Sequence, residues 1–170
     1  MRIFQIRTIS DKLLASNAPK TKKDLLLIKE KGVDCIVDLR IKNKFLEILT
    51  EKYRCWRLGI KHVTVPIKLF EEMPNIKIFN YINNLVSKQN KILIHCNSGR
   101  HRTNLICAGL SILRKDKTLD EAIQDLLKND YYVVKIKSYK KNNEISIAYR
   151  KFLKLKERLF EFKDMFSHLN

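Results

Sequence analysis

The chain is poor in the residues that interrupt regular structure. Its 170 residues include only four glycines and three prolines, which excludes collagen-like, low-complexity and flexible-linker architectures. There is no run of eighteen consecutive apolar residues, so no membrane-spanning helix is predicted. Residues 1–12 lack the apolar core and small-residue cleavage site of a secretory leader. We therefore expect a single globular domain over residues 1–170.

Cysteine and tryptophan are also scarce. The four cysteines show neither a metal-ligand spacing nor a disulfide framework, which predicts no metal site and a reducing, cytoplasmic setting. Cys35 and Cys107 lie inside apolar runs, where cysteine normally packs as a small core residue. The one tryptophan, Trp56, is likewise expected to be a packing residue.

Acidic residues are few relative to basic ones. There are 18 Asp and Glu against 35 Lys and Arg, and the formal net charge is +17. Such an excess predicts attraction to polyanions, namely nucleic acid, anionic lipid or phosphate-rich small molecules. The alternative is a solvated lysine surface that serves only solubility. Composition leaves both interpretations open.

Short apolar segments alternate with longer amphipathic ones along the chain. Strands are predicted at 33–39, 61–66 and 91–95, and helices at 21–32, 42–59, 75–88, 103–114 and 118–128. This alternation predicts an α/β fold with a central, mainly parallel sheet of four or five strands flanked by helices. Residues 91–95, "KILIH", are expected to form a central strand. The tail over 144–166 predicts a basic amphipathic C-terminal helix.

Capping signals mark the ends of two of these helices. Thr21 with Asp24, and Thr118 with Glu121, each have the spacing of a capping box at a helix start. Gly32 follows the first helix, where glycine commonly ends a helix.

The stretch "HCNSGRHRT", His95 to Thr103, joins the predicted central strand to an apolar helix. A loop that enters a helix N-terminus presents free backbone N–H groups and the positive end of the helix dipole, which together bind anions. The same environment favours a thiolate at Cys96. Gly99 lets successive N–H groups point inward, and Arg102 offers a planar fork to two oxygens of a tetrahedral anion.

This nonapeptide resembles His-Cys-x-x-Gly-x-x-Arg-Ser/Thr, the phosphate-binding loop of the cysteine-dependent tyrosine and dual-specificity phosphatases. Upstream, "KLLASNAP", "GVDCIVDLR" and "GIKHVTVPI" resemble the N-terminal half of the compact atypical dual-specificity phosphatases. Arg100 and His101 are similar to the plant-and-fungal atypical branch and related bacterial proteins. The resemblance covers about residues 12–127, and it implies a dual-specificity phosphatase-like fold and a single phosphatase domain.

The resemblance implies a covalent mechanism without a metal or organic cofactor. Cys96 would attack phosphorus and form a phosphocysteine, which water then hydrolyses. Arg102 and the loop N–H groups would hold the phosphate oxygens, Thr103 would assist departure of the sulfur, and His95 would organise the loop. The phosphate-binding set is Asn97, Ser98, Gly99, Arg100, His101 and Arg102.

Two further pairs are candidates for the site. Members of the superfamily place a general-acid aspartate on a loop that this chain occupies with Leu69 and Phe70. The nearest carboxyls are Glu71 and Glu72, which either serve as the acid or only cap the helix that follows. Asp38 and Arg40 end a strand beside the expected site, where they are either a structural pair or part of the catalytic machinery.

Three function classes remain open at this point. The first is a phosphatase acting on phosphoproteins or related phosphomonoesters. The second is a phosphatase acting on a polyanion, such as an inositol polyphosphate, a phosphoinositide or the 5′ end of RNA. The third is a catalytically weak phosphate-binding module. The expected partners are a phosphorylated protein or polyphosphorylated small molecule, with anionic lipid or RNA as candidates for the basic surface; the oligomeric state is not predicted.

Overall fold

The computed structural model describes residues 3–41, 44–68, 76–128, 157 and 160–161. The chain divides into two compact units, Met1–Thr103 and Asn104–Asn170. The basic helix predicted over 144–166 falls outside the described residues except at 157, 160 and 161. Within the described part of the chain, no helix is both long and apolar enough to cross a bilayer.

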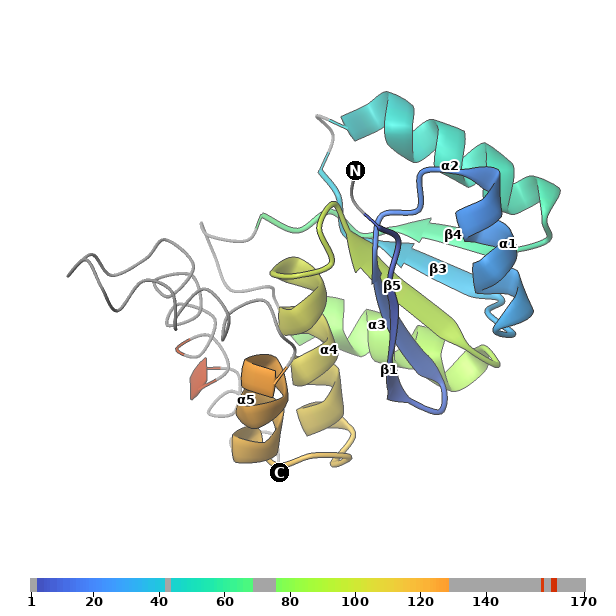
Figure 1. The fold of residues 1–170 in the computed structure, drawn as a ribbon. Coiled ribbons are helices and arrows are strands. Elements are labelled where there is room, and N and C mark those ends of the chain that lie inside the picture. The colour runs from blue at the N-terminus through green and yellow to red at the C-terminus, as the bar shows by residue number, and fades with distance from the viewer. Residues whose placement is uncertain (1–2, 42–43, 69–75, 129–156, 158–159, 162–170) are drawn as a thin grey trace. The chain divides into compact units, whose positions relative to one another are not determined.

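The first unit contains a five-stranded sheet in the order β1-β2-β5-β3-β4 (Figure 1). Its strands are β1 (Ile6–Ser10), β2 (Leu13–Asn17), β3 (Cys35–Asp38), β4 (Lys61–Thr64) and β5 (Ile92–Cys96). All neighbours pair in parallel except β1, which runs antiparallel to β2. The predicted α/β fold with a mainly parallel sheet and a central "KILIH" strand is confirmed. The two N-terminal strands were not predicted.

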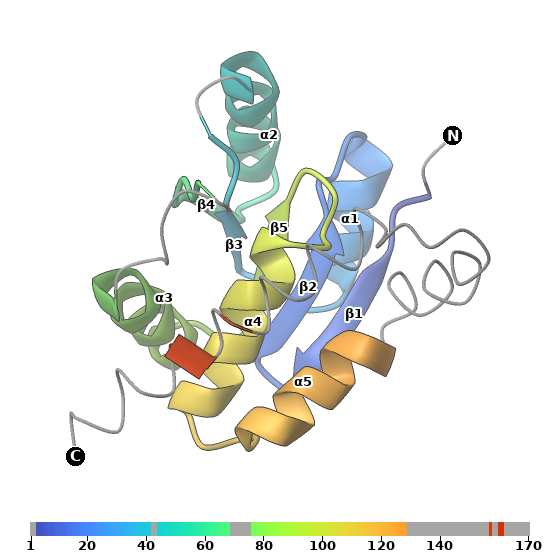
Figure 2. The same cartoon turned by 90° about the vertical axis from the view of Figure 1, so that its left-hand side faces the viewer.

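Three helices of the first unit flank this sheet. They are α1 (Lys22–Glu30), α2 (Phe45–Arg57) and α3 (Ile76–Lys88). In both views α1 and α2 lie together on one side of the sheet and α3 lies on the other (Figures 1 and 2). Helix α4 (Arg102–Leu113) begins at the end of this unit and continues into the second, whose described part also contains α5 (Leu119–Lys128).

The core on the α1 and α2 side forms because alternate strand residues point to the same face. Leu14 of β2, Ile36 of β3 and Leu93 of β5 are aligned across the sheet. They belong to one buried cluster, which is completed by Leu25, Ile28, Val33, Cys55 and Ile60. The three inner strands are buried along their whole length, as expected for strands covered on both faces.

The two predicted capping boxes and the helix end at Gly32 are confirmed. Thr21 accepts a hydrogen bond from the Asp24 N–H, and the Asp24 carboxylate accepts one from the Thr21 N–H, so both halves of the capping box are present. Thr118 and Glu121 make the same reciprocal bonds before α5. Gly32 follows α1 with φ of +78°, a left-handed conformation that favours glycine.

Helix α2 departs from the expected packing. Trp56 is 72% exposed, so its prediction as a packing residue is wrong. The helix instead buries Glu51 and Cys55. The sequence pattern misleads here because most of the large apolar side chains of α2 are exposed to solvent while a carboxylate occupies the inner face.

Candidate active site

The loop from β5 to α4 lies at the carboxyl edge of the parallel strands. Cys96 is the last residue of β5 and Arg102 is the first residue of α4. In the sheet register Cys96 lies opposite Asn17 at the end of β2, and His95 lies opposite Asp38 at the end of β3. Strand pairing therefore brings together residues that are far apart in the chain.

Gly99 allows this loop to close against β2. Its φ is +68°, and a Cβ at this position would lie 2.5 Å from the Ser16 carbonyl oxygen and 2.7 Å from the Asn17 nitrogen. Backbone atoms cannot move aside cheaply, so no larger residue fits. The Gly99 N–H donates to the Cys96 sulfur at 3.3 Å, so the loop backbone at this point faces the thiol.

Strands β1 and β2 hold the loop from outside. Arg7 donates from Nη2 to the Gly99 carbonyl oxygen at 2.9 Å, and the Ala18 N–H donates to the Asn97 carbonyl oxygen at 3.3 Å. Sequence reasoning missed Arg7. A lone arginine on an unrecognised edge strand carries no local signal, since its partner is 92 positions away.

Cys96 is the one cysteine whose pKa is shown to be lowered. Burial alone would raise it, but the Thr103 hydroxyl and N–H, the Arg102 charge and the Ser98 N–H favour the thiolate, and the pKa falls from 9.0 to about 7. Burial raises the pKa of Cys35 to about 11 and that of Cys55 to about 12. The loop thus distinguishes one reactive thiol from inert core thiols.

Arg102 and Thr103 are the first two residues of α4. Arg102 donates from Nη1 to the Leu39 carbonyl oxygen at 2.9 Å, and this bond fixes the guanidinium at the end of β3. Thr103 is fully buried. Its hydroxyl has no well-aligned hydrogen-bond partner in the described part of the chain, so it is available to donate to the sulfur once Cys96 is ionised.

His95 is fully buried and held at both ring nitrogens. Nε2 lies 2.7 Å from Glu51 Oε1, and Nδ1 lies 3.3 Å from the Cys96 carbonyl oxygen. Each ring nitrogen therefore faces a hydrogen-bond acceptor. An imidazolium, which carries a proton on both nitrogens, donates to both acceptors. Burial opposes the charge on His95, but the Glu51 charge and hydrogen bond prevail and raise the pKa of His95.

Asp38 and Arg40 form a buried ion pair that extends to Glu51. Arg40 Nε lies 2.9 and 3.0 Å from the two Asp38 carboxylate oxygens, and Arg40 Nη2 lies 2.7 Å from Asp38 Oδ2 and 2.6 Å from Glu51 Oε2. Burial opposes ionisation of Glu51, but the charge of His95, hydrogen bonds from His62 and His95 and the charge of Arg40 lower the pKa of Glu51 to about 2. The geometry favours the structural interpretation of this pair, with His95 as the link to the loop.

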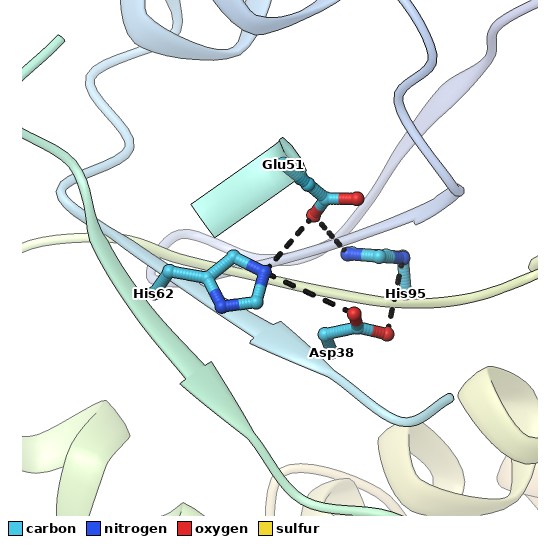
Figure 3. Close-up of side chains that lie close together, drawn as sticks. All are labelled: Asp38, Glu51, His62 and His95. Atoms are coloured by element: carbon cyan, nitrogen blue, oxygen red, sulfur yellow. Dashed lines mark hydrogen bonds and ion pairs between the residues drawn. The ribbon is translucent and has the colours of Figure 1, made fainter. Parts of the chain in front are cut away.

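Glu51 and His62 are the residues of this network that sequence reasoning missed. Glu51 lies within an amphipathic helix pattern that gives no sign of a buried carboxylate, and His62 is a single histidine on an edge strand. Figure 3 shows both side chains converging with Asp38 and His95. His62 Nε2 lies 3.2 Å from Glu51 Oε1.

The same four side chains are the group in the described residues that has metal-ligand chemistry, with donor atoms within 4.8 Å of one another. Arg40, however, already fills the carboxylate oxygens with close hydrogen bonds. A cation would face this guanidinium charge, and the Glu51 contacts to the two histidines have hydrogen-bond lengths. The arrangement therefore favours a charge-balanced ion network over a metal centre.

The variable loop positions remain more accessible than the residues that anchor the loop. Asn97 is exposed, and Ser98, Arg100 and His101 are partly exposed. Glu71 and Glu72, the candidate acids, lie outside the described residues.

The described geometry holds an ionisable thiol, converging backbone N–H groups and an arginine, which together suit nucleophilic attack on a tetrahedral anion.

One family model matches most of this region. The model described as "Polymorphic toxin system, DSP-PTPase phosphatase" (Tc-R-P) matches residues 13–117, from β2 beyond the end of α4. This span is more than half of the chain and includes the whole loop. None of the curated proteins matches the chain in sequence.

Solved structures share the fold at low sequence identity. TpbA from P. aeruginosa is 14% identical, with 74% of this chain and 73% of that chain covered and a TM-score of 0.60. PTPMT1 is 15% identical, with 96% and 99% covered and a TM-score of 0.64. Tk-PTP is 20% identical, with 90% and 97% covered and a TM-score of 0.61. The similarity at these identities concerns the fold.

We predict selective alkylation of Cys96. Its thiolate forms near pH 7, whereas Cys35 and Cys55 stay protonated, because burial raises their pKa values to about 11 and about 12. Iodoacetamide labelling followed against pH, with the modified peptides identified by mass spectrometry, should give an inflection near 7 for Cys96 and none near 7 for Cys35 or Cys55. An inflection at the ordinary pKa of a free thiol would mean that the loop does not stabilise the thiolate.

We also predict that Glu51→Gln strongly destabilises the fold, since it leaves Arg40 and His95 with too little opposing charge. The expected loss is about 3–5 kcal/mol in the free energy of unfolding, measured by urea denaturation. The control is Glu30→Gln on α1, an exposed carboxylate outside the network, which should cost less than about 1 kcal/mol.

The pH dependence of the free energy of unfolding tests whether Glu51 and His95 are charged partners in the folded protein. The lowered pKa of Glu51 contributes stability that is present above its ordinary 4.5 and lost as the pH falls toward about 2. The raised pKa of His95 contributes stability that is present below its ordinary 6.5 and lost as the pH rises through its folded value. In Glu51→Gln, the free energy of unfolding should change less with pH in both of these ranges. An unchanged pH dependence would refute the network.

Proposed function

Because the chain belongs to the DSP-PTPase phosphatase family described for polymorphic toxin systems, we propose that it hydrolyses phosphomonoesters through a phosphocysteine at Cys96. The observation that carries the proposal is the buried Cys96 thiol at the start of the loop, whose sulfur accepts a hydrogen bond from the Gly99 N–H at 3.3 Å. Against the effect of burial, hydrogen bonds from Thr103 and the Arg102 charge lower its pKa to about 7. A core cysteine without this role would be expected to have a raised pKa, as Cys35 and Cys55 have.

The reaction proceeds in two steps. The Cys96 thiolate attacks phosphorus, an S–P bond forms, and the P–O bond to the leaving group breaks with its electron pair on oxygen. Water then attacks phosphorus, the S–P bond breaks, and inorganic phosphate and the thiolate are released. Arg102 and the loop N–H groups bind the phosphate oxygens in both steps, and Thr103 donates to the departing sulfur.

The remaining residues act around this centre. His95, held by Glu51, positions the residue that carries the nucleophile, and Asp38 with Arg40 supports that contact. Glu71 and Glu72 are our candidates for the acid that protonates the leaving oxygen. Arg100 and His101 support an assignment to the atypical branch of the dual-specificity phosphatases.

The substrate is either a phosphoprotein or a polyanion. A variant of TpbA has been solved with pTyr and PTPMT1 with PI(5)P, so proteins of this fold bind both kinds of phosphate. Arg100 and His101 are partly exposed in the loop, and the chain carries a net charge of +17. These features favour a substrate with a second phosphate beside the one being hydrolysed.

We expect Cys96→Ser to lower turnover of p-nitrophenyl phosphate by more than about a thousandfold, since the nucleophile is lost. Arg102→Ala should lower it by about a hundredfold or more, because the oxyanion loses a charged partner. Cys107→Ser, the same substitution at a buried cysteine outside the loop, is the control and should keep turnover. Phosphate binding by Cys96→Ser, measured by calorimetry, should persist.

Retained turnover in Cys96→Ser would rule out the covalent mechanism. Phosphate binding by the native protein without turnover of any substrate in a panel of p-nitrophenyl phosphate, phosphopeptides, inositol phosphates and triphosphorylated RNA would favour the phosphate-binding module.

A double substitution tests the polyanion. Arg100→Ala with His101→Ala should lower kcat/KM for an inositol polyphosphate about tenfold or more, because charge-assisted contacts to a second phosphate are lost. Activity on p-nitrophenyl phosphate should hardly change. Lys88→Ala on α3, which removes the same one formal positive charge with His counted as neutral, serves as the control for net charge. Equal losses on both substrates would mean that Arg100 and His101 only support the loop, and a phosphoprotein substrate would then be favoured.

A further inference from the structure

Helix α2 presents its apolar side chains to solvent. Leu46 is 75% exposed and Trp56 is 72% exposed, while the carboxylate of Glu51 is buried on the inner face. We call the exposed set the outer face of α2; it consists of Phe45, Leu46, Leu49, Tyr53 and Trp56. A helix that buries a charge and exposes leucine and tryptophan reverses the usual pattern of a soluble protein, and such faces mark interaction surfaces.

The outer face is continuous along the helix. At about 100° per residue its members span an arc of about 100°, centred opposite Glu51 and Cys55, and the stretch from Phe45 to Trp56 is about 17 Å long. Lys52 borders this arc on one side and Arg57 on the other. Both basic residues are exposed, whereas the two acidic residues of the helix, Glu47 and Glu51, lie off the outer face.

Contacts between side chains hold the residues of the outer face in place. The rings of Tyr53 and Trp56 lie with centroids 6.0 Å apart, and Arg57 Nη1 donates to the Tyr53 hydroxyl at 3.3 Å. On the inner side, Glu51 is anchored to Arg40 at 2.6 Å and to His95 at 2.7 Å. The ion network therefore sets the rotation of α2 about its axis, and with it the outward direction of the apolar residues.

The charge of this surface decides between two binding partners, a second copy of the chain and an anionic membrane. Two copies of the chain meeting through this face would each bring the basic border of Lys52 and Arg57 and a net charge of +17, and like charges oppose that contact. An apolar strip with tryptophan, tyrosine and phenylalanine, bordered by lysine and arginine, has the composition of helices that lie in the headgroup region of anionic membranes. Long basic side chains at the border reach the headgroups while their stems contact the apolar layer.

We propose that the outer face of α2 docks on an anionic lipid bilayer, with Leu46, Leu49 and Trp56 entering the interface and with Lys52 and Arg57 contacting acidic headgroups. The helix begins after the carboxyl end of β3, the edge of the sheet at which the Cys96 loop also lies. Docking therefore holds this edge close to the membrane. The proposal goes beyond the phosphatase function and does not depend on it.

Trp56 provides a direct probe, because it is the only tryptophan in the chain. The full-length protein is titrated with vesicles of phosphatidylcholine alone and with vesicles containing equal phosphatidylcholine and phosphatidylserine. With the anionic vesicles, the Trp56 emission should shift to shorter wavelength and be quenched by brominated lipid. With the neutral vesicles both effects should be much weaker.

Matched variants separate the outer face from the general basic charge. Leu46→Ser with Leu49→Ser keeps the probe and should lower the partition coefficient about tenfold or more, since both side chains lose apolar contact. Tyr81→Ser is the control on α3, where it removes a large side chain that is 49% exposed. This substitution should change the partition coefficient less than about twofold. Lys52→Glu with Arg57→Glu should weaken binding far more than Lys77→Glu with Lys88→Glu on α3, which changes the net charge equally.

Three results would overturn the proposal. The first is absence of binding to the anionic vesicles. The second is binding that leaves the Trp56 emission unchanged, which would assign the contact to another basic surface. The third is equal weakening by the α2 and α3 charge variants. Because phosphatase activity on p-nitrophenyl phosphate is assayed without lipid, failure here is distinct from failure of the proposed function.

Discussion

The contact between Gly99 and the backbone of β2 is the constraint on which the loop depends. The Ser16 carbonyl oxygen lies 2.5 Å from where a Cβ would be, so the loop closes only with glycine in a left-handed conformation. This closure points the Gly99 N–H at the Cys96 sulfur. Arg7 then fixes the Gly99 carbonyl oxygen from the neighbouring strand. The conformation of this loop thus relies on β1 and β2 as much as on its own nine residues.

The buried ion network connects the loop to the α2 side of the sheet. Two carboxylates, Asp38 and Glu51, face Arg40 and His95, so the network is balanced when His95 is protonated. Buried charges need such complete pairing, because each unpaired charge carries a large desolvation penalty. The network holds His95 next to Cys96 and also sets the orientation of α2. The loop at the carboxyl edge of the sheet and the outer face of α2 therefore share one structural support.

Much of the fold and the centre of the site could be predicted from local sequence patterns. The alternation of apolar segments predicted the mainly parallel sheet, and "KILIH" is the central strand as expected. The capping boxes at Thr21 and Thr118 were recognised because both partners lie within one turn. Strands β1 and β2 were missed because "IRTIS" and "LLASN" are short and carry polar or small residues that are also common in turns. Trp56 was misassigned because helical periodicity does not tell which face meets the core.

By itself, the sequence determined the elements whose causes are local: the strand and helix order, the caps, and a loop in which a cysteine, a glycine and an arginine have fixed offsets. Tertiary structure alone decided which distant residues meet that loop. Arg7 reaches Gly99 across 92 positions, and Glu51 reaches His95 across 44. Such contacts depend on strand order and helix rotation, which are set by the packing of the whole sheet, so no short stretch of sequence encodes them.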